Sequence, residues 1–183
     1  MSDDKDDIKK SPFGEAENWQ MNACVGLNGG PYDYWALSKG YFSGGHVICE
    51  SIMSNHGIGI DILFYPLMQN YRQGLELGIK HLRDDNHKKG THNLKSLWAE
   101  VREGCVAAFG DNDEEREQCL SAIDTAVDCF HEIDPNNEGV RYPESKDGKP
   151  YLTDRRIVNI IPVYEKMKKA ELALSFIDHL KNG

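Results

Sequence analysis

The stretch from residue 60 to residue 83 constrains the fold more than any other part of the chain. Its apolar residues recur every three or four positions, which is the spacing of one face of an α-helix. They are Phe64, Leu67, Met68, Tyr71, Leu75, Ile79 and Leu82. A helix with so continuous an apolar face must be covered by other elements, so we expect it to be the central helix. Pro66 predicts a kink in it, or a straight part that begins near residue 66.

Four further segments show helical spacing of apolar residues. They cover about residues 34–54, 91–109, 113–131 and 159–181. Thr91 is a candidate N-cap, and Pro162 is tolerable because it would lie in a first turn. The segment "IDPNNEGVRYPESKDGKPYL" instead carries turn residues, including Asp147-Gly148 between short extended pieces. The sequence therefore predicts an all-α fold, an antiparallel bundle of about five helices with a short extended or hairpin insert before the last helix.

The length of 183 residues fits one domain. We expect a disordered tail over residues 1–15, because this stretch is highly charged and has almost nothing to bury, and a single domain over residues 16–183. The formal net charge of -9 opposes nonspecific DNA binding, since such a surface repels a phosphate backbone. No apolar run is long enough to span a membrane, and the N-terminus lacks an apolar signal region.

The cysteines indicate a reducing compartment. They are odd in number and form no C-x-x-C pair, so the sequence favours free thiols in a cytoplasmic protein. They are Cys24, Cys49, Cys105, Cys119 and Cys129.

Glycines interrupt two of the predicted helices and predict close helix packing. Gly40, Gly44 and Gly45 lie in the first, and Gly74 and Gly78 lie four residues apart in the second. Together they offer more close-packing surface than one small bundle needs, which favours a homodimer.

The order of several motifs resembles a group of prokaryotic HEPN-like helical proteins. The motifs are "DILFYPLMQNYRQGLELGIKHL", "THNLKSLWAEV", "FHEIDPNNEGVRYP" and "DGKP", within about residues 30–182. The resemblance implies a helical bundle that usually dimerises. It also implies a setting in toxin–antitoxin or phage-defence systems, where many members are metal-independent ribonucleases and others are non-catalytic binding or scaffolding domains.

The chain departs from the ribonuclease members at their Arg-x(4–6)-His motif. In that motif the guanidinium holds a phosphate while the imidazole moves the proton of the 2′-hydroxyl. Arg83 and His87 have three residues between them, and Arg72 and His81 have eight. Either the active pair is assembled from different segments, or there is none.

The candidate catalytic residues are Arg72, Glu76 and His92. Arg72 and Glu76 form a row with Lys80 at helical spacing four, which is either a solvated face of ion pairs or part of a cleft where Arg72 holds an anion. His92 would be the general base of such a cleft, or a structural hydrogen-bonding group near the start of its helix. Arg141, Tyr142 and Lys80 are candidate ligand-binding residues.

The sequence indicates no metal and no cofactor. The spacing of His81, His87 and His92 matches neither a two-histidine helix motif nor a zinc finger. Glycine-rich phosphate loops and nucleophile elbows are absent as well. Two hypotheses remain open: a metal-independent protein acting on RNA or a nucleotide, which would be ribonuclease-like if it is an enzyme, and a non-catalytic dimeric module that binds a partner protein.

Overall fold

The computed structural model describes residues 19–26, 33–83, 91–154 and 157–182. The chain divides into two units, Met1–Tyr32 and Asp33–Gly183. The described part of the first unit contains one short 3-10 helix, η2 (Trp19–Met21). The tail expected over residues 1–15 lies outside the described residues, and the single domain expected over residues 16–183 begins before the division between the two units.

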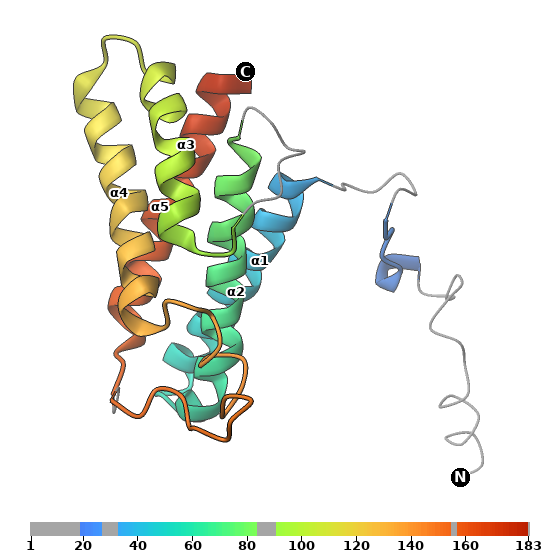
Figure 1. Cartoon of the computed structure of the whole chain (residues 1–183). Helices are drawn as coiled ribbons and strands as arrows, with labels where there is room; N and C mark the ends of the chain where they lie inside the picture. The colour runs from blue at the N-terminus through green and yellow to red at the C-terminus, as the bar shows by residue number, and fades with distance from the viewer. Residues whose placement is uncertain (1–18, 27–32, 84–90, 155–156, 183) are drawn as a thin grey trace. The chain divides into compact units, whose positions relative to one another are not determined.

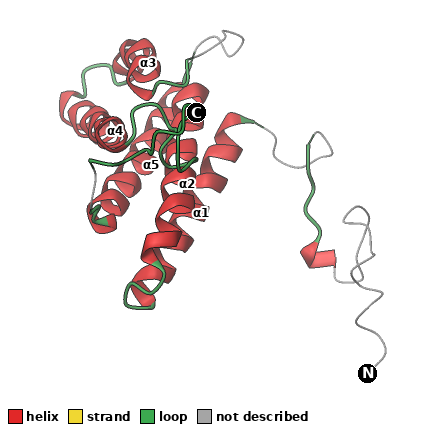
Figure 2. Cartoon of the chain, turned by 60° about the horizontal axis from the view of Figure 1, so that its bottom comes forward, coloured by secondary structure: helices red, strands yellow, loops and turns green. Residues whose placement is uncertain are grey.

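The second unit is a bundle of five α-helices in its described part. They are α1 (Tyr34–Ser54), α2 (Ile60–His81), α3 (Leu94–Ala108), α4 (Asp113–Ile133) and α5 (Ile160–Asn182) (Figure 1). The view in Figure 2 shows these helices joined by loops, and the described residues form no β-strand. The prediction of an all-α bundle is confirmed. The predicted insert is an ordered loop between α4 and α5 with one isolated antiparallel bridge, from Glu144 to Pro150.

Local capping chemistry sets the helix starts. The side chains of Asp33, Asn93 and Asn112 each accept a backbone N–H from the first turn of α1, α3 and α4. The prediction of Thr91 as the cap of α3 is wrong, because Asn93 is better placed and is the stronger capping residue type. Thr91 instead accepts the backbone N–H of Asn93.

The predicted central helix is α2, which contacts α1, α3 and α5. Five of its stripe residues are fully buried, namely Leu67, Met68, Tyr71, Leu75 and Ile79. The apolar period therefore identified the core face of α2 correctly, and α1, α3 and α5 cover it.

Four of the five glycines, Gly44, Gly45, Gly74 and Gly78, serve contacts inside one protomer, whereas Gly40 is open. A Cβ atom at Gly45 would lie 2.5 Å from the Tyr71 ring, and one at Gly78 would lie 2.8 Å from Leu174. These glycines let α1 approach α2, and α2 approach α5, more closely than any larger residue would allow. Our inference of a homodimer from spare glycine surface loses its basis, because the bundle itself uses that surface.

The cysteines and the hydropathy give two simpler results. No disulfide joins any of the five cysteines, as the sequence predicted. In the described part of the chain, no helix combines the length and the apolar character needed to cross a membrane.

Two glycines of α1 provide a matched test of this packing. Gly40→Ala should raise the free energy of unfolding by about 0.5–1 kcal/mol, because the added methyl meets no atom within 4 Å and alanine favours helix. Gly45→Ala should lower it by about 1–3 kcal/mol, because the methyl meets the Tyr71 ring. Urea unfolding of both variants measures the two changes, and equal effects of the same sign would contradict the packing described here.

Candidate functional site

The charged row of α2 lies inside the protein. Arg72 is 1% exposed and Glu76 is 3% exposed, whereas the side chain of Lys80 is 15% exposed. The solvated-face interpretation of this row is therefore wrong. The row is buried because the segment before α3 and the loop after α4 pack against this face of α2. The helical period predicts which residues share a face, but not whether another segment covers it.

Arg72 connects α2 to the segment that carries His92. Its terminal Nη2 donates a hydrogen bond to the backbone oxygen of His92 at 2.9 Å. Burial lowers the pKa of Arg72, and the charges of Glu76 and Asp134 oppose that shift. Because the guanidinium is buried and engaged, Arg72 positions the His92 segment rather than presenting a charge to an anion from solvent.

Glu76 holds the imidazole of His92. Its Oε1 accepts hydrogen bonds from Nζ of Lys80 at 2.6 Å and from Nδ1 of His92 at 2.9 Å. A carboxylate can only accept, so Nδ1 carries the proton in this pair and the other ring nitrogen, Nε2, keeps its lone pair in the neutral ring. The His92 side chain is 85% exposed, so the ring is open to a molecule in solution.

Two other histidines pair with carboxylates but differ from His92 in exposure. His46 lies between Glu171 (2.8 Å) and the Tyr71 hydroxyl (3.0 Å), and His81 lies 2.7 Å from Asp178. Their side chains are 19% and 22% exposed, and they join α5 to α1 and to α2. These two pairs hold helices together, whereas the third pair ends in a ring that faces solvent.

The loop after α4 carries Arg141 and Tyr142. The buried carboxylate of Asp134 accepts the backbone N–H of Glu138 and of Val140, which fixes the loop at its start. The Arg141 guanidinium lies 5.1 Å from the centre of the Tyr142 ring and donates to its hydroxyl at 3.1 Å. Both side chains are exposed, so this pair presents a charge and a ring at the surface.

Arg141 and Tyr142 line a cavity of about 410 Å³ together with α2. Tyr65 and Gln69 contribute from α2, and sequence reasoning missed both of them. The signal was present, because residues 65, 69, 72, 76 and 80 follow one another at spacings of three and four and so share one face of α2. Along this face of α2, Tyr65 and Gln69 therefore line the cavity, and Arg72 and Glu76 follow them beside His92.

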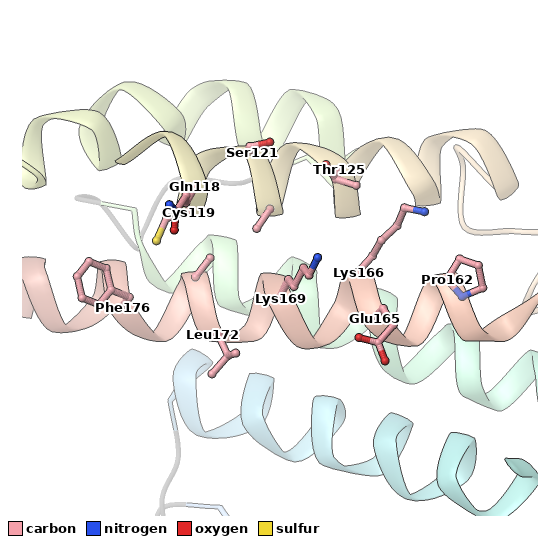
Figure 3. A pocket seen from close by; sticks show the side chains of 12 residues that line it. Gln118, Cys119, Ser121, Thr125, Pro162, Glu165, Lys166, Lys169, Leu172 and Phe176 are labelled. Carbon is pink, nitrogen blue, oxygen red and sulfur yellow. The ribbon is translucent and has the colours of Figure 1, made fainter. Parts of the chain in front are cut away.

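A larger groove of about 980 Å³ lies between α4 and α5. Figure 3 shows it from close by, with side chains from both helices along its length. Its apolar lining includes Cys119, Ala122, Leu172 and Phe176, and two lysines, Lys166 and Lys169, also line it. No candidate site residue from the sequence lies here.

Within the described residues, no group of three or more histidine, cysteine, aspartate or glutamate side chains is arranged to hold a metal ion. His87 and its aspartate neighbours Asp84 and Asp85 lie outside the described residues.

No protein-family model, curated protein or solved structure matches the chain. The resemblance to HEPN-like proteins therefore stays a hypothesis that rests on the order of the quoted motifs. An all-helical bundle hosts many unrelated functions, so functional inference has to come from the site.

Arg72→Ala should destabilise the protein by about 3–5 kcal/mol, because it removes the buried positive charge that Glu76 and Asp134 face and leaves the His92 carbonyl without its hydrogen-bond donor. Arg116→Ala is the matched control, since Arg116 pairs with the exposed Asp113 at the start of α4 and should cost under about 1 kcal/mol. Chemical unfolding monitored by circular dichroism gives both values. A loss below 1 kcal/mol in Arg72→Ala would contradict the structural role.

Proposed function

We propose that the protein acts on a phosphodiester of RNA, or on a nucleotide, without a metal, and that His92 and Glu76 carry the chemistry. The observation that supports this most strongly is the exposed imidazole whose Nδ1 is held by a buried carboxylate. A group in this arrangement is oriented on one side and free to exchange a proton on the other. The function therefore rests on an exposed ring fixed by a buried partner.

The reaction that fits this pair is transesterification at phosphorus. Nε2 of His92 accepts the proton of a 2′-hydroxyl, and the 2′-oxygen forms a bond to the adjacent phosphorus. The bond from phosphorus to the 5′-oxygen breaks, and this oxygen takes a proton from a water molecule, whose hydroxide then takes back the proton held by Nε2 of His92. The products are a 2′,3′-cyclic phosphate and a 5′-hydroxyl end, so atoms and charges balance without a further reactant.

Lys80 and Arg72 have supporting roles in this proposal. Nζ of Lys80 shares Oε1 of Glu76 with His92, which places a cation beside the imidazole, where it attracts a phosphate. Arg72 fixes the backbone of His92 and so limits how far the ring can drift from Glu76. We therefore assign Arg72 as a positioning residue, and His92 as the residue that touches substrate.

The net charge of the protein limits which substrates it can bind. At -9 the surface as a whole disfavours long polyanions bound without specificity, so a short or single-stranded RNA or a nucleotide fits better than duplex DNA. The HEPN-like resemblance extends the proposal to a cytoplasmic role in a prokaryotic toxin–antitoxin or phage-defence system.

His92→Ala should lower cleavage of a short single-stranded RNA, in buffer with a chelator, by about 100-fold or more. Because the ring is 85% exposed, the melting temperature should stay nearly the same. His131→Ala is the control, since His131 is an exposed histidine at the end of α4 and should leave the rate unchanged. Gel separation of labelled RNA measures the rate, and wild-type cleavage by His92→Ala would refute the proposal.

Glu76→Gln tests whether Glu76 contributes by orienting the imidazole of His92 or through its negative charge. The amide can still accept a hydrogen bond from Nδ1, but it no longer stabilises a protonated imidazole, so we expect a rate between those of the wild type and His92→Ala. A circular dichroism melt checks that the variant is folded. Equal rates for Glu76→Gln and the wild type would remove Glu76 from the chemistry.

A second candidate function is a non-catalytic dimeric module, and the groove between α4 and α5 favours it. We propose that a second copy of this chain occupies the groove. Leu172 lies along it with 69% of its surface exposed, which is unusual for a leucine beside other apolar groups. Covering this groove with a symmetric copy would remove that apolar surface from water.

Charge complementarity supports a second copy as the occupant. Phe109, just before α4, packs against Phe176 near the end of α5, so α4 and α5 are antiparallel. The first turn of α4 is acidic, whereas the groove lysines belong to the first half of α5. A two-fold axis across the groove would bring the acidic end of each copy onto the lysines of the other.

Light scattering at micromolar concentration should then give a mass near twice 20.7 kDa for the wild type. Leu172→Glu should give a monomer, because it places like charges near the axis. Leu37→Glu should remain dimeric, since Leu37 is exposed but lies nine positions before His46, on the side of α1 that faces away from α5. A monomeric wild type would overturn the dimer and leave the groove for a different protein.

A further inference from the structure

The cavity between α2 and the loop after α4 contains chemistry that the proposed reaction does not use. On one side, Tyr65 and Gln69 line it from α2, and on the other, Arg141 and Tyr142 line it from the loop. Its volume of about 410 Å³ suits a group the size of a nucleotide. A ligand of this cavity would have to match the chemistry of these side chains.

The amide of Gln69 has an unsatisfied end. Its Oε1 is buried, and no hydrogen-bond partner for it exists among the residues that the structure describes. Turning the amide by 180° would bury the nitrogen at the same place, so one end needs a partner in either orientation. The adjacent Asn70 differs, because its Nδ2 donates to the Pro66 backbone oxygen at 2.8 Å. A buried amide end without a partner is costly, and a ligand can remove that cost.

The guanidinium of Arg141 is available for an anion. Three other arginines of the described part, Arg83, Arg102 and Arg116, each form an ion pair with a carboxylate. Arg141 forms none with any described residue, and it lies over the Tyr142 ring instead. A guanidinium stacked on a ring is held in place with its remaining N–H groups free, which is the geometry that binds a phosphate.

We propose that this cavity binds a nucleobase together with its phosphate. A base can stack on the exposed rings of Tyr65 and Tyr142. Its polar edge pairs with the amide of Gln69, which lines the cavity, once that side chain turns its buried, unpartnered end toward the ligand. The attached phosphate pairs with Arg141. The ligand is therefore a nucleoside monophosphate, or one nucleotide of a single-stranded RNA.

The position of the cavity connects it to the proposed chemistry. Gln69 and Glu76 are seven residues apart on one face of α2, which is about 10 Å along a helix. One RNA strand can therefore place a base in the cavity while a neighbouring phosphodiester lies at His92. This reading of the cavity as a substrate subsite rests on the proposed function, whereas the binding itself can be measured without any reaction.

Adenosine monophosphate is the first probe, titrated into the full-length protein and followed by calorimetry or by nuclear magnetic resonance. Arg141→Ala and Tyr142→Ala should each weaken its binding about 10-fold or more. Gln69→Leu should weaken it similarly while leaving the melting temperature unchanged or higher, because the variant removes a buried polar group without a partner. A purely structural role for Gln69 would not produce this combination.

Two control variants and a second probe make the test decisive. Tyr41→Ala removes an exposed tyrosine of α1, and Arg116→Ala removes an arginine of α4, so both should bind the nucleotide as the wild type does. Inorganic phosphate alone should bind at least 10-fold more weakly than the nucleotide. Equal binding of phosphate and nucleotide, or no effect of Gln69→Leu, would overturn the assignment of a base site.

The two proposals fail in different experiments. Nucleotide binding that survives in His92→Ala but disappears in Arg141→Ala supports the subsite whether or not RNA is cleaved. RNA cleavage that depends on His92 but not on Gln69, Arg141 or Tyr142 would overturn the subsite and leave the reaction standing. Competition by an acidic peptide at the same affinity as the nucleotide would also overturn it, because the cavity would then accept any anion.

Discussion

The arrangement of the polar side of the bundle depends on one buried guanidinium. Arg72 lies buried in the middle of α2, where its Nη2 donates to a backbone oxygen before α3 and its charge faces those of Glu76 and Asp134, while its Nε has no hydrogen-bond partner among the described residues. Asp134 in turn fixes the first backbone N–H groups of the loop after α4. Two segments that are far apart in the sequence are therefore positioned relative to the same side chain. A buried charge is costly unless such partners surround it, so the position of these segments is strongly determined.

The same residues serve stability and the proposed chemistry. Glu76 compensates the buried charge of Arg72 and also orients the exposed ring of His92. A loss of activity after a change at Arg72 or Glu76 would therefore report both folding and function, whereas His92 can be altered with little consequence for the core because its ring is exposed. Effects on stability and on the proposed activity can therefore be separated at the exposed His92, but not at the buried Arg72 and Glu76.

The three histidine–carboxylate pairs show why a residue pair alone does not define a site. His46 and His81 make hydrogen bonds of the same kind and length as His92, but they lie between helices and connect them. What distinguishes His92 is that only one side of its ring is used by the protein. The candidate site is therefore marked by an exposed group beside a buried partner. The neighbouring cavity has the same arrangement, since the unpartnered amide end of Gln69 is buried while Tyr65 and Arg141 are exposed.

The sequence by itself determined the five helices, the core stripe of α2 and the grouping of residues 65, 69, 72, 76 and 80 on one helix face. These follow from interactions within a few residues, namely the helical period and the capping side chains. Tertiary structure alone decided that this face is covered and that Gly45 and Gly78 serve contacts within one protomer. It also decided that, of the histidines paired with carboxylates in the described residues, His92 alone is exposed. The physical reason is that the helical repeat predicts which residues share a face of a helix, whereas the burial of that face depends on which distant segment packs against it. Here that segment is held by a backbone carbonyl, which has the same chemistry at every position and leaves no signal in the sequence.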